Sequence, residues 1–153
     1  MILPIKKILC PTDFSEPSYE GLKAGNELAN FFSAEIVLVH VISTAQILPV
    51  SYEPAAALLP QILREVEESA EKSLERITEE KISKGISART LLVQGGPAEE
   101  IVRAAEEEAV DLIVIATHGQ FGWKKFISGS VTERVVRLAG RPVLTIHAPA
   151  TEA

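Results

Sequence analysis

Five short apolar runs alternate along the chain with longer segments of helical periodicity. The runs lie at residues 5–10, 35–41, 87–94, 111–117 and 142–147. The second and fourth are continuous stretches rich in branched aliphatic residues, which is typical of parallel strands covered on both faces. Strands that alternate with helices predict βαβ units. We therefore expect one doubly wound α/β domain over residues 1–153.

Capping residues mark the predicted helices. Ser15 is a candidate N-cap for a helix that runs to about residue 32. The longest helix spans residues 55–84, with Gly85 as its expected C-terminal cap. Pro97 begins a third helix that runs to residue 109. Ser130 and Glu133 fit the S-x-x-E capping box of a fourth helix, which ends near residue 139.

The composition limits the classes of protein to which this chain can belong. Of the 153 residues, 46% are apolar and 24% are charged, and the formal net charge is −6. An acidic chain argues against general binding to nucleic acid or to an anionic membrane. No apolar stretch is long enough to span a bilayer. Cys10 is the single cysteine, so no intrachain disulfide forms, and we expect a cytoplasmic protein.

The loop after the fourth strand has the composition of an anion-binding site. It opens at Gly119 and Gly122 and closes with Gly129 and Ser130 at the start of a helix. A helix N-terminus leaves backbone N–H groups unpaired and carries a partial positive charge, which favours a bound phosphate. The alternative is that Gly129 and Ser130 form only a helix cap.

Asp13 is a candidate at the end of the first strand, because open parallel sheets bind ligands beyond the carboxyl ends of their strands. An acidic residue before a helix often serves as a cap. Ser15 competes for that role, which leaves Asp13 to meet a ligand.

The spacing of Ala116, Gly119 and Gly129-Ser130 resembles the signature of ATP-binding universal stress proteins. That signature is Gly, two residues, Gly, nine residues, then Gly-Ser or Gly-Thr. Pro11-Thr12-Asp13 also resembles the end of the family's first strand. The resemblance extends over residues 5–146. It implies an open, Rossmann-like parallel sheet of five strands in the order 3-2-1-4-5, with helices on both faces.

The resemblance also implies a site for ATP or another adenine nucleotide, with or without Mg²⁺, between the first and fourth strands. Asp13 and the backbone of Pro11 and Thr12 would contact the adenine or the ribose, and Val41 would pack on the base. The ribose and phosphates would be lined by Ala116, Thr117 and Gly119, and held by Gly129, Ser130, Val131 and Thr132. His118 is a further candidate to contact the phosphate or the ribose, and the alternative is that it faces solvent in the loop.

Ala116 departs from the signature, which has glycine at this position. Alanine is unfavourable there if the backbone needs a positive φ, and only narrows the pocket if φ is ordinary. The sequence leaves both alternatives open.

Three histidines, His40, His118 and His147, fall near strand ends. In the implied order, the second and fifth strands lie three spacings of ~4.8 Å apart, about 14 Å in all. A single zinc ion cannot join ligands at that separation. We therefore expect no metal site from these residues.

The resemblance implies a homodimer that pairs the last strands edge against edge, with Val143, Leu144, Thr145 and Ile146 central. The alternative is an edge protected by residues 148–153.

The sequence therefore predicts a nucleotide-binding sensor or switch of the stress response. No catalytic residue is identified, so we expect any hydrolysis of the nucleotide to be slow or to depend on an unknown protein partner. Two alternatives remain: a nucleotide-independent interaction module, or a hydrolase that uses Asp13 and a metal.

Overall fold

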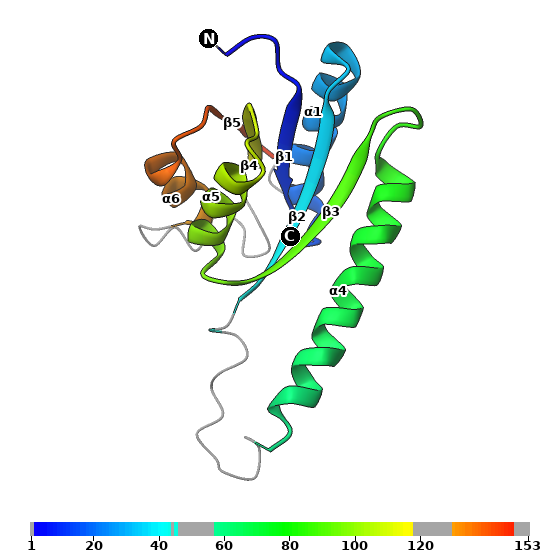
Figure 1. The fold of residues 1–153 in the computed structure, drawn as a ribbon, viewed down its shortest axis with the longest axis vertical. Coiled ribbons are helices and arrows are strands. Elements are labelled where there is room, and N and C mark those ends of the chain that lie inside the picture. Colours follow the sequence, from blue (N-terminus) through cyan, green and yellow to red (C-terminus); the bar gives the residue numbers. More distant parts are fainter. Residues whose placement is uncertain (1, 44, 46–56, 118–129, 149–153) are drawn as a thin grey trace.

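The computed structural model describes residues 2–43, 45, 57–117 and 130–148 (Figure 1). Strands and helices alternate along this described part of the chain. They are β1 (Lys7–Pro11), α1 (Glu16–Phe32), β2 (Glu35–Ser43), α4 (Leu59–Lys81), β3 (Ala88–Gly95), α5 (Pro97–Glu107), β4 (Leu112–Ala116), α6 (Val131–Leu138) and β5 (Val143–Ile146). Every predicted strand and helix is present, with ends that differ by a few residues at most.

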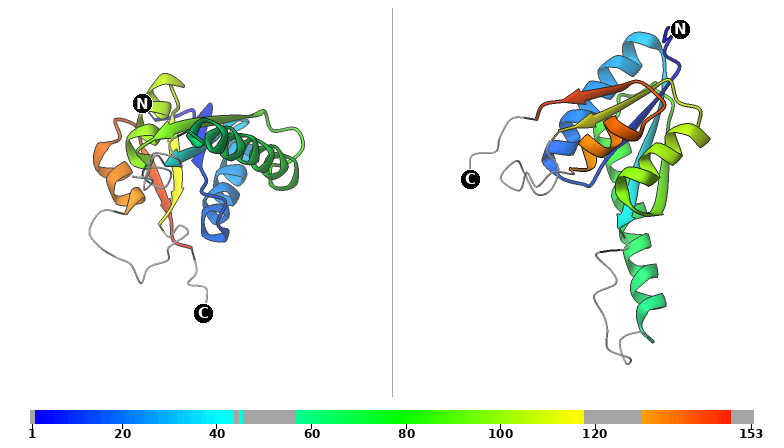
Figure 2. Two further views of the ribbon diagram at one scale, coloured as in Figure 1. Left: turned by 90° about the horizontal axis from the view of Figure 1, so that it is seen from below. Right: turned by 90° about the vertical axis from the view of Figure 1, so that its left-hand side faces the viewer.

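The five strands form one parallel sheet in the order β3-β2-β1-β4-β5. This confirms the predicted doubly wound sheet and its strand order. Helices α1 and α4 cover one face of the sheet, and α5 and α6 cover the other (Figure 2). The strand order reverses between β1 and β4, and open α/β sheets bind ligands at such a reversal.

Burial on both faces explains the continuous apolar runs. On β2, Ile36 and Leu38 share a core cluster with residues of α1 and α4. Val37 and Val39 belong to the cluster formed with α5 and α6. All four side chains are fully buried. Because successive side chains of a strand point to opposite faces, a strand covered on both faces has no polar alternation.

Helix α1 lies close to the sheet because two of its glycines face the strands. A Cβ on Gly25 would overlap the Sγ of Cys10, and a Cβ on Gly21 would lie 3.0 Å from the backbone nitrogen of Ala116. Cys10 is completely buried, and this burial raises the pKa of its thiol to about 12. The neutral thiol therefore acts as a small packing group between β1 and α1.

Two of the predicted N-caps are confirmed. The side chain of Ser15 accepts a hydrogen bond from the backbone N–H of Ser18 at the start of α1. The side chain of Ser130 accepts one from the backbone N–H of Glu133 at the start of α6, over 3.2 Å. Both helices that border the predicted site therefore begin where the sequence places them.

The predicted end of the long helix at Gly85 is wrong, because α4 ends at Lys81. Ile82 leaves the helix in an extended conformation and is buried. Asn26 of α1 binds both the backbone N–H and the hydroxyl of Ser83, over 2.8 and 2.9 Å. These tertiary contacts turn the chain before Gly85, which has a φ of +98° in the turn that follows.

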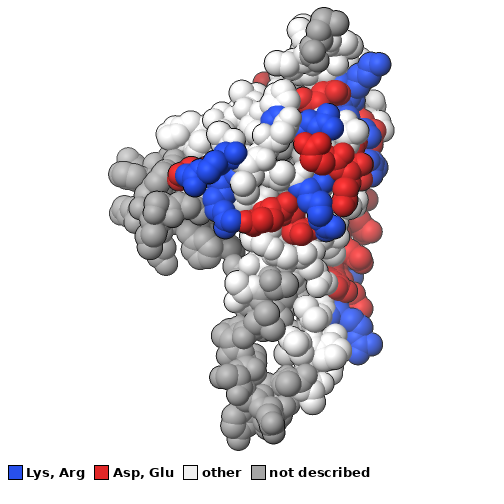
Figure 3. Space-filling view, turned by 60° about the vertical axis from the view of Figure 1, so that its left-hand side comes forward, with Lys and Arg blue, Asp and Glu red and all other residues white. Residues whose placement is uncertain are grey.

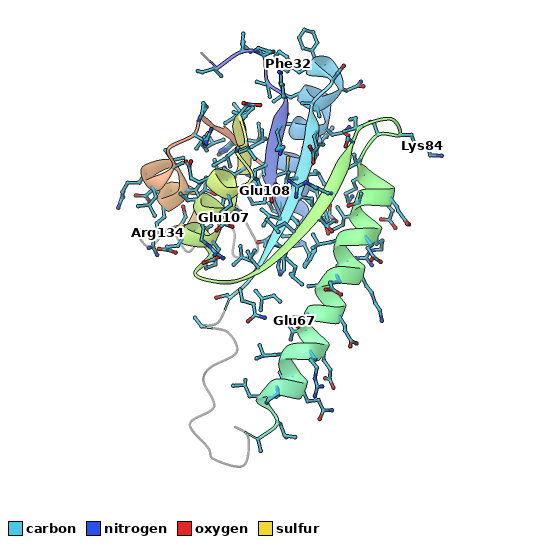
Figure 4. The ribbon with its side chains drawn as sticks, in the orientation of Figure 1. Phe32, Glu67, Lys84, Glu107, Glu108 and Arg134 are labelled. Atoms are coloured by element: carbon cyan, nitrogen blue, oxygen red, sulfur yellow. The ribbon has the colours of Figure 1, made fainter. Side chains whose placement is uncertain are left out.

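Helix α4 contacts the sheet mainly through its C-terminal half. Its buried residues are Ala70, Leu74 and Ile77. Further toward the N-terminus, Glu67, labelled in Figure 4, accepts a hydrogen bond from Gln94 of β3. The preceding turns project beyond the sheet (Figure 1). No helix within the described ranges is long and apolar enough to cross a membrane.

Charged side chains of both signs are interspersed on the face drawn in Figure 3. Arg134 of α6 pairs with Glu99 of α5, and Arg141 pairs with Glu106 over 3.1 Å. These side chains are partly exposed to solvent, so each pair adds little to stability. The pairs link α6 and the chain leading into β5 to α5.

We predict that Gly25→Ala destabilises the protein, because the added methyl overlaps the Sγ of Cys10. Overpacking of a buried site costs about 1–3 kcal/mol, which exceeds the helix-propensity gain of about 1 kcal/mol. The free energy of unfolding in denaturant measures the effect. Adding Cys10→Ala removes the overlapping sulfur, so the double variant is expected to show a favourable coupling energy. Additive losses would contradict this packing model.

Candidate functional site

The candidate site lies where β1, β2 and β4 end and α6 begins. β1 pairs with β4 at Ile8–Leu112 and Leu9–Ile113, and continuation of this register places Thr12 opposite Ala116. The hydroxyl of Thr132, in the first turn of α6, donates to the carbonyl of Ala116 over 2.6 Å. This bond fixes the start of α6 against the end of β4.

Most of the predicted site residues are described and lie at this edge of the sheet: Pro11, Thr12, Asp13, Val41, Ala116, Thr117, Ser130, Val131 and Thr132. His118, Gly119 and Gly129 lie outside the described residues. Val41 is partly buried and packs against the core cluster on the α5 side of β2. Thr117 donates its backbone N–H to Ile146 over 2.8 Å, which extends the pairing of β4 with β5.

Thr12 is buried, and its side chain organises the turn after β1. Its Oγ1 accepts the backbone N–H of Phe14 over 3.1 Å and lies 2.9 Å from the Oγ of Ser18. The Ser18 hydroxyl donates to the carbonyl of Ser15 over 2.7 Å. Ser18 has only one hydroxyl proton, so Thr12 must be the donor in the pair. A directed chain of three hydrogen bonds therefore runs from Phe14 to Ser15.

Asp13 projects from the middle of this turn. Its Oδ1 accepts the backbone N–H of Ser15 over 3.0 Å and also accepts the Ser15 hydroxyl proton. The carboxylate thus has a local role at the start of α1, beside Ser15, which caps the helix. Ser15 is therefore the cap of α1, as expected, and Asp13 supports this cap through hydrogen bonds to Ser15.

His40 is the side chain of β2 that reaches this turn. Its Nδ1 lies 2.8 Å from the carbonyl oxygen of Thr12, so Nδ1 carries the proton in this contact. Burial lowers the pKa of His40 below its ordinary value, and the hydrogen bond to Thr12 and the charge of Asp13 act in the opposite direction. The imidazole is therefore mainly neutral at pH 7, with its proton on Nδ1.

Phe14 completes the turn in a strained conformation. Its φ is +66°, in the left-handed region that a bulky residue rarely adopts. Its ring lies against the His40 ring, with centroids 4.2 Å apart and planes 31° apart. Sequence reasoning missed this pairing, because nothing in the sequence indicates a positive φ at Phe14.

Ala116 causes no backbone strain. The described non-glycine residues with positive φ are Phe14, Ser33 and Ala109, so Ala116 has the ordinary conformation of a β4 residue. Its Cβ lies 3.6 Å from the position that a Cβ on Gly21 would take. The alternative in which alanine is unfavourable at this position is therefore excluded, and the methyl group occupies space next to α1.

The N-terminus of α6 faces the same edge. The first helical hydrogen bond runs from the N–H of Arg134 to the carbonyl of Ser130, and the Glu133 N–H is bound by the Ser130 side chain. The N–H groups of Val131 and Thr132 precede these bonds and have no acceptor within the helix. The Thr132 hydroxyl proton is used by Ala116, so in this arrangement Thr132 offers a ligand its backbone N–H and not its side chain.

Comparison with known proteins decides the family. A model of the universal stress protein family matches residues 4–147. The chain belongs to the universal stress protein family. Universal stress protein MJ0531 of Methanocaldococcus jannaschii is 35% identical over 147 residues, which cover 96% of this chain and 85% of that protein.

Universal stress protein MJ0577 of the same organism is 35% identical over an alignment of 157 positions, which covers 95% of this chain and 97% of that protein. Its solved structure superimposes with a TM-score of 0.83 at 33% identity, over 96% of this chain and 99% of that one. The fold of this universal stress protein is therefore shared over nearly its full described length.

Two more distant universal stress proteins have been solved with nucleotides. One, in complex with cAMP, is 22% identical with a TM-score of 0.61, over 94% of this chain and 97% of that one. The other, from Archaeoglobus fulgidus in complex with dAMP, is 21% identical with a TM-score of 0.59, over 95% of this chain and 98% of that one. At this level of identity the likeness concerns the fold.

We predict that Thr12→Val destabilises this universal stress protein by about 1–3 kcal/mol, because it leaves the Phe14 N–H without its buried acceptor. Thr12→Ser is the matched control, since it keeps the hydroxyl and both hydrogen bonds. The free energy of unfolding of the two variants gives the comparison. Equal stabilities would show that the hydrogen-bond chain does not support the turn.

Proposed function

We propose that this protein binds an adenine nucleotide, ATP or AMP, at the carboxyl ends of β1 and β4 and acts as a cytoplasmic sensor or switch in the stress response. The observation that carries the proposal is the anchoring of the α6 N-terminus to the end of β4 by Thr132 and Ala116. This anchor holds backbone donors of α6 at the carboxyl end of β4, which lies next to β1 at the reversal of strand order.

The phosphate end of the nucleotide would meet the first turn of α6. The N–H groups of Val131 and Thr132 lie at the positive end of the helix dipole, which favours an anion. Gly119 and Gly129 of the signature would complete this cradle. Family membership and the nucleotide complexes of two relatives, with cAMP and dAMP, support the assignment of phosphate and adenine.

The nucleoside end would meet the turn after β1 and the end of β2. Asp13 would contact the ribose or the adenine, and Val41 would pack on the base. The ordinary backbone of Ala116 supports the proposal, because the departure from the signature does not distort β4. The methyl group lies toward Gly21 and α1.

A switch of this kind would work through ligand-dependent stability. A nucleotide that binds only the folded state stabilises it by an amount that grows with the logarithm of the ratio of its concentration to its dissociation constant. If the nucleotide binds one conformation of the protein more tightly than another, it raises the population of that conformation. A partner protein that recognises this conformation would then bind more strongly. This mechanism needs no catalytic group, and any hydrolysis would be slow or dependent on the partner.

Val131→Pro tests the phosphate cradle. Proline is favoured in the first turn of a helix, and Ser130 has the extended conformation (φ −55°, ψ 149°) that a residue before proline requires. The variant therefore removes one N–H donor and keeps α6. A hydrogen bond to a charged group contributes about 1.5–3 kcal/mol, so ATP is expected to bind roughly 10- to 150-fold more weakly.

The measurement is isothermal titration of nucleotide-stripped protein with ATP and Mg²⁺, with AMP and GTP as comparisons. Val131→Ala is the control, because it keeps the N–H and shortens only a side chain that is 40% exposed. Both variants should keep the wild-type thermal stability. Wild-type protein that binds no adenine nucleotide, by titration and by thermal shift, would overturn the proposal in favour of the interaction module.

We also propose that the protein forms a symmetric homodimer through the open edge of β5. Backbone bonds from Ile113 to Pro142 and from Thr117 to Ile146 show which residues of the β5 segment face β4. Since adjacent residues of a strand direct their backbone groups to opposite edges, Val143 and Thr145 face the open edge. Leu144 and Thr145 are exposed, which supports burial by a second copy.

Thr145→Pro is expected to weaken this dimer, because it removes an outward-facing N–H while the bonds to β4 remain. Proline is tolerated on sheet edges. Sedimentation of the variant across a concentration series would show dissociation at concentrations where the matched Thr145→Ala variant stays dimeric. A proline variant that dimerises as well as the alanine variant would exclude pairing through this edge.

A further inference from the structure

We propose that His40 is a positioning residue of the nucleotide site, which holds the Asp13 turn in the conformation that binds the ligand. The inference rests on the proposed nucleotide function and adds a residue to it. His40 sits on β2 directly before Val41, and its side chain contacts the turn after β1. β2 thus supplies Val41, which is expected to pack on the base, and His40, which supports the turn of Asp13, the expected ribose contact.

The first support is a hydrogen bond across two strands. The backbone N–H of Thr12 donates to the carbonyl of Val39 over 2.8 Å, as a continuation of β1–β2 pairing. The carbonyl of Thr12 then turns to accept the Nδ1–H of His40 over 2.8 Å. Both backbone groups of the residue before Asp13 are therefore fixed by β2.

The second support is ring packing against a strained residue. Phe14, directly after Asp13, has a φ of +66°, which costs free energy for a residue with a side chain. The His40 ring lies 4.2 Å from the Phe14 ring, between centroids. Asp13 is therefore flanked by two residues that His40 contacts, Thr12 through a hydrogen bond and Phe14 through its ring.

The effect of His40 on ligand affinity depends on the fraction of molecules in which the turn has its binding conformation. If the turn adopts its binding conformation only part of the time, the apparent dissociation constant rises by the inverse of that fraction. Loss of the His40 hydrogen bond would let Phe14 relax to a negative φ and would lower the competent fraction. The effect would appear in ligand affinity and in local opening of the turn, while the core clusters stay intact.

Two variants separate the hydrogen bond from the ring. His40→Asn keeps an N–H near the Nδ1 position but loses the ring, and His40→Phe keeps a ring but has no donor. We expect His40→Phe to bind ATP roughly three- to tenfold more weakly, the fold-change that corresponds to one neutral hydrogen bond. His40→Asn, which keeps the donor and loses only the ring contact with Phe14, is expected to lose less affinity than His40→Phe. His40→Leu, which is smaller and lacks the donor, replaces His40→Phe if that variant does not fold.

Amide hydrogen exchange without ligand gives an independent readout. The N–H groups of Phe14 and Ser15 are bound by Thr12 and Asp13 within the turn. They should exchange faster in His40→Phe than in His40→Asn, while amides of β2 and β4 exchange at wild-type rates. Equal protection of the turn in both variants, or equal affinity for ATP, would overturn the proposal.

The two readouts also distinguish this proposal from the proposed function. Wild-type protein that binds no adenine nucleotide contradicts the function, and in that case exchange at Phe14 and Ser15 still decides whether His40 holds the turn. A general loss of stability, with slower-exchanging core amides also affected, would show that His40 is only a packing residue and would contradict the positioning role.

Discussion

Hydrogen bonding of β1 along both of its edges is the constraint on which the rest of the structure depends. β1 pairs with β2 on one side and with β4 on the other. Its side chains Ile8, Leu9 and Cys10 are apolar and fully buried, so both faces are covered as well, by α1 and α4 on one side and by α5 and α6 on the other. Because β2 lies on one side of β1 and β4 on the other, the strand order reverses between β1 and β4. The turn after β1 and the end of β4 therefore lie at the same end of the sheet.

Close packing at that end comes from small residues. Gly21 and Gly25 let α1 approach β4 and β1, and Ala116 and Cys10 fill the remaining space. In this setting the alanine in the signature is a packing residue on the α1 side, in an ordinary strand conformation. The alanine methyl occupies space near α1 without straining the backbone of β4.

The site itself is held by hydrogen bonds that cross between elements. Thr132 ties α6 to β4, Thr12 ties the turn after β1 to α1 through Ser18, and His40 ties the same turn to β2. Each bond joins a side chain to a partner on another element, so the arrangement exists only when the sheet has assembled. A nucleotide bound there would be sensitive to the packing of α6, β4, α1 and β2.

Local periodicity, capping chemistry and motif spacing were enough to predict the strands, the helix starts at Ser15 and Ser130 and the family resemblance. Tertiary structure alone decided the end of α4, where Asn26 captures Ser83, and the ordinary backbone of Ala116. It also decided the His40–Phe14 contact. These features arise between residues far apart in the chain or from a backbone angle that neighbouring packing imposes, so no local pattern encodes them.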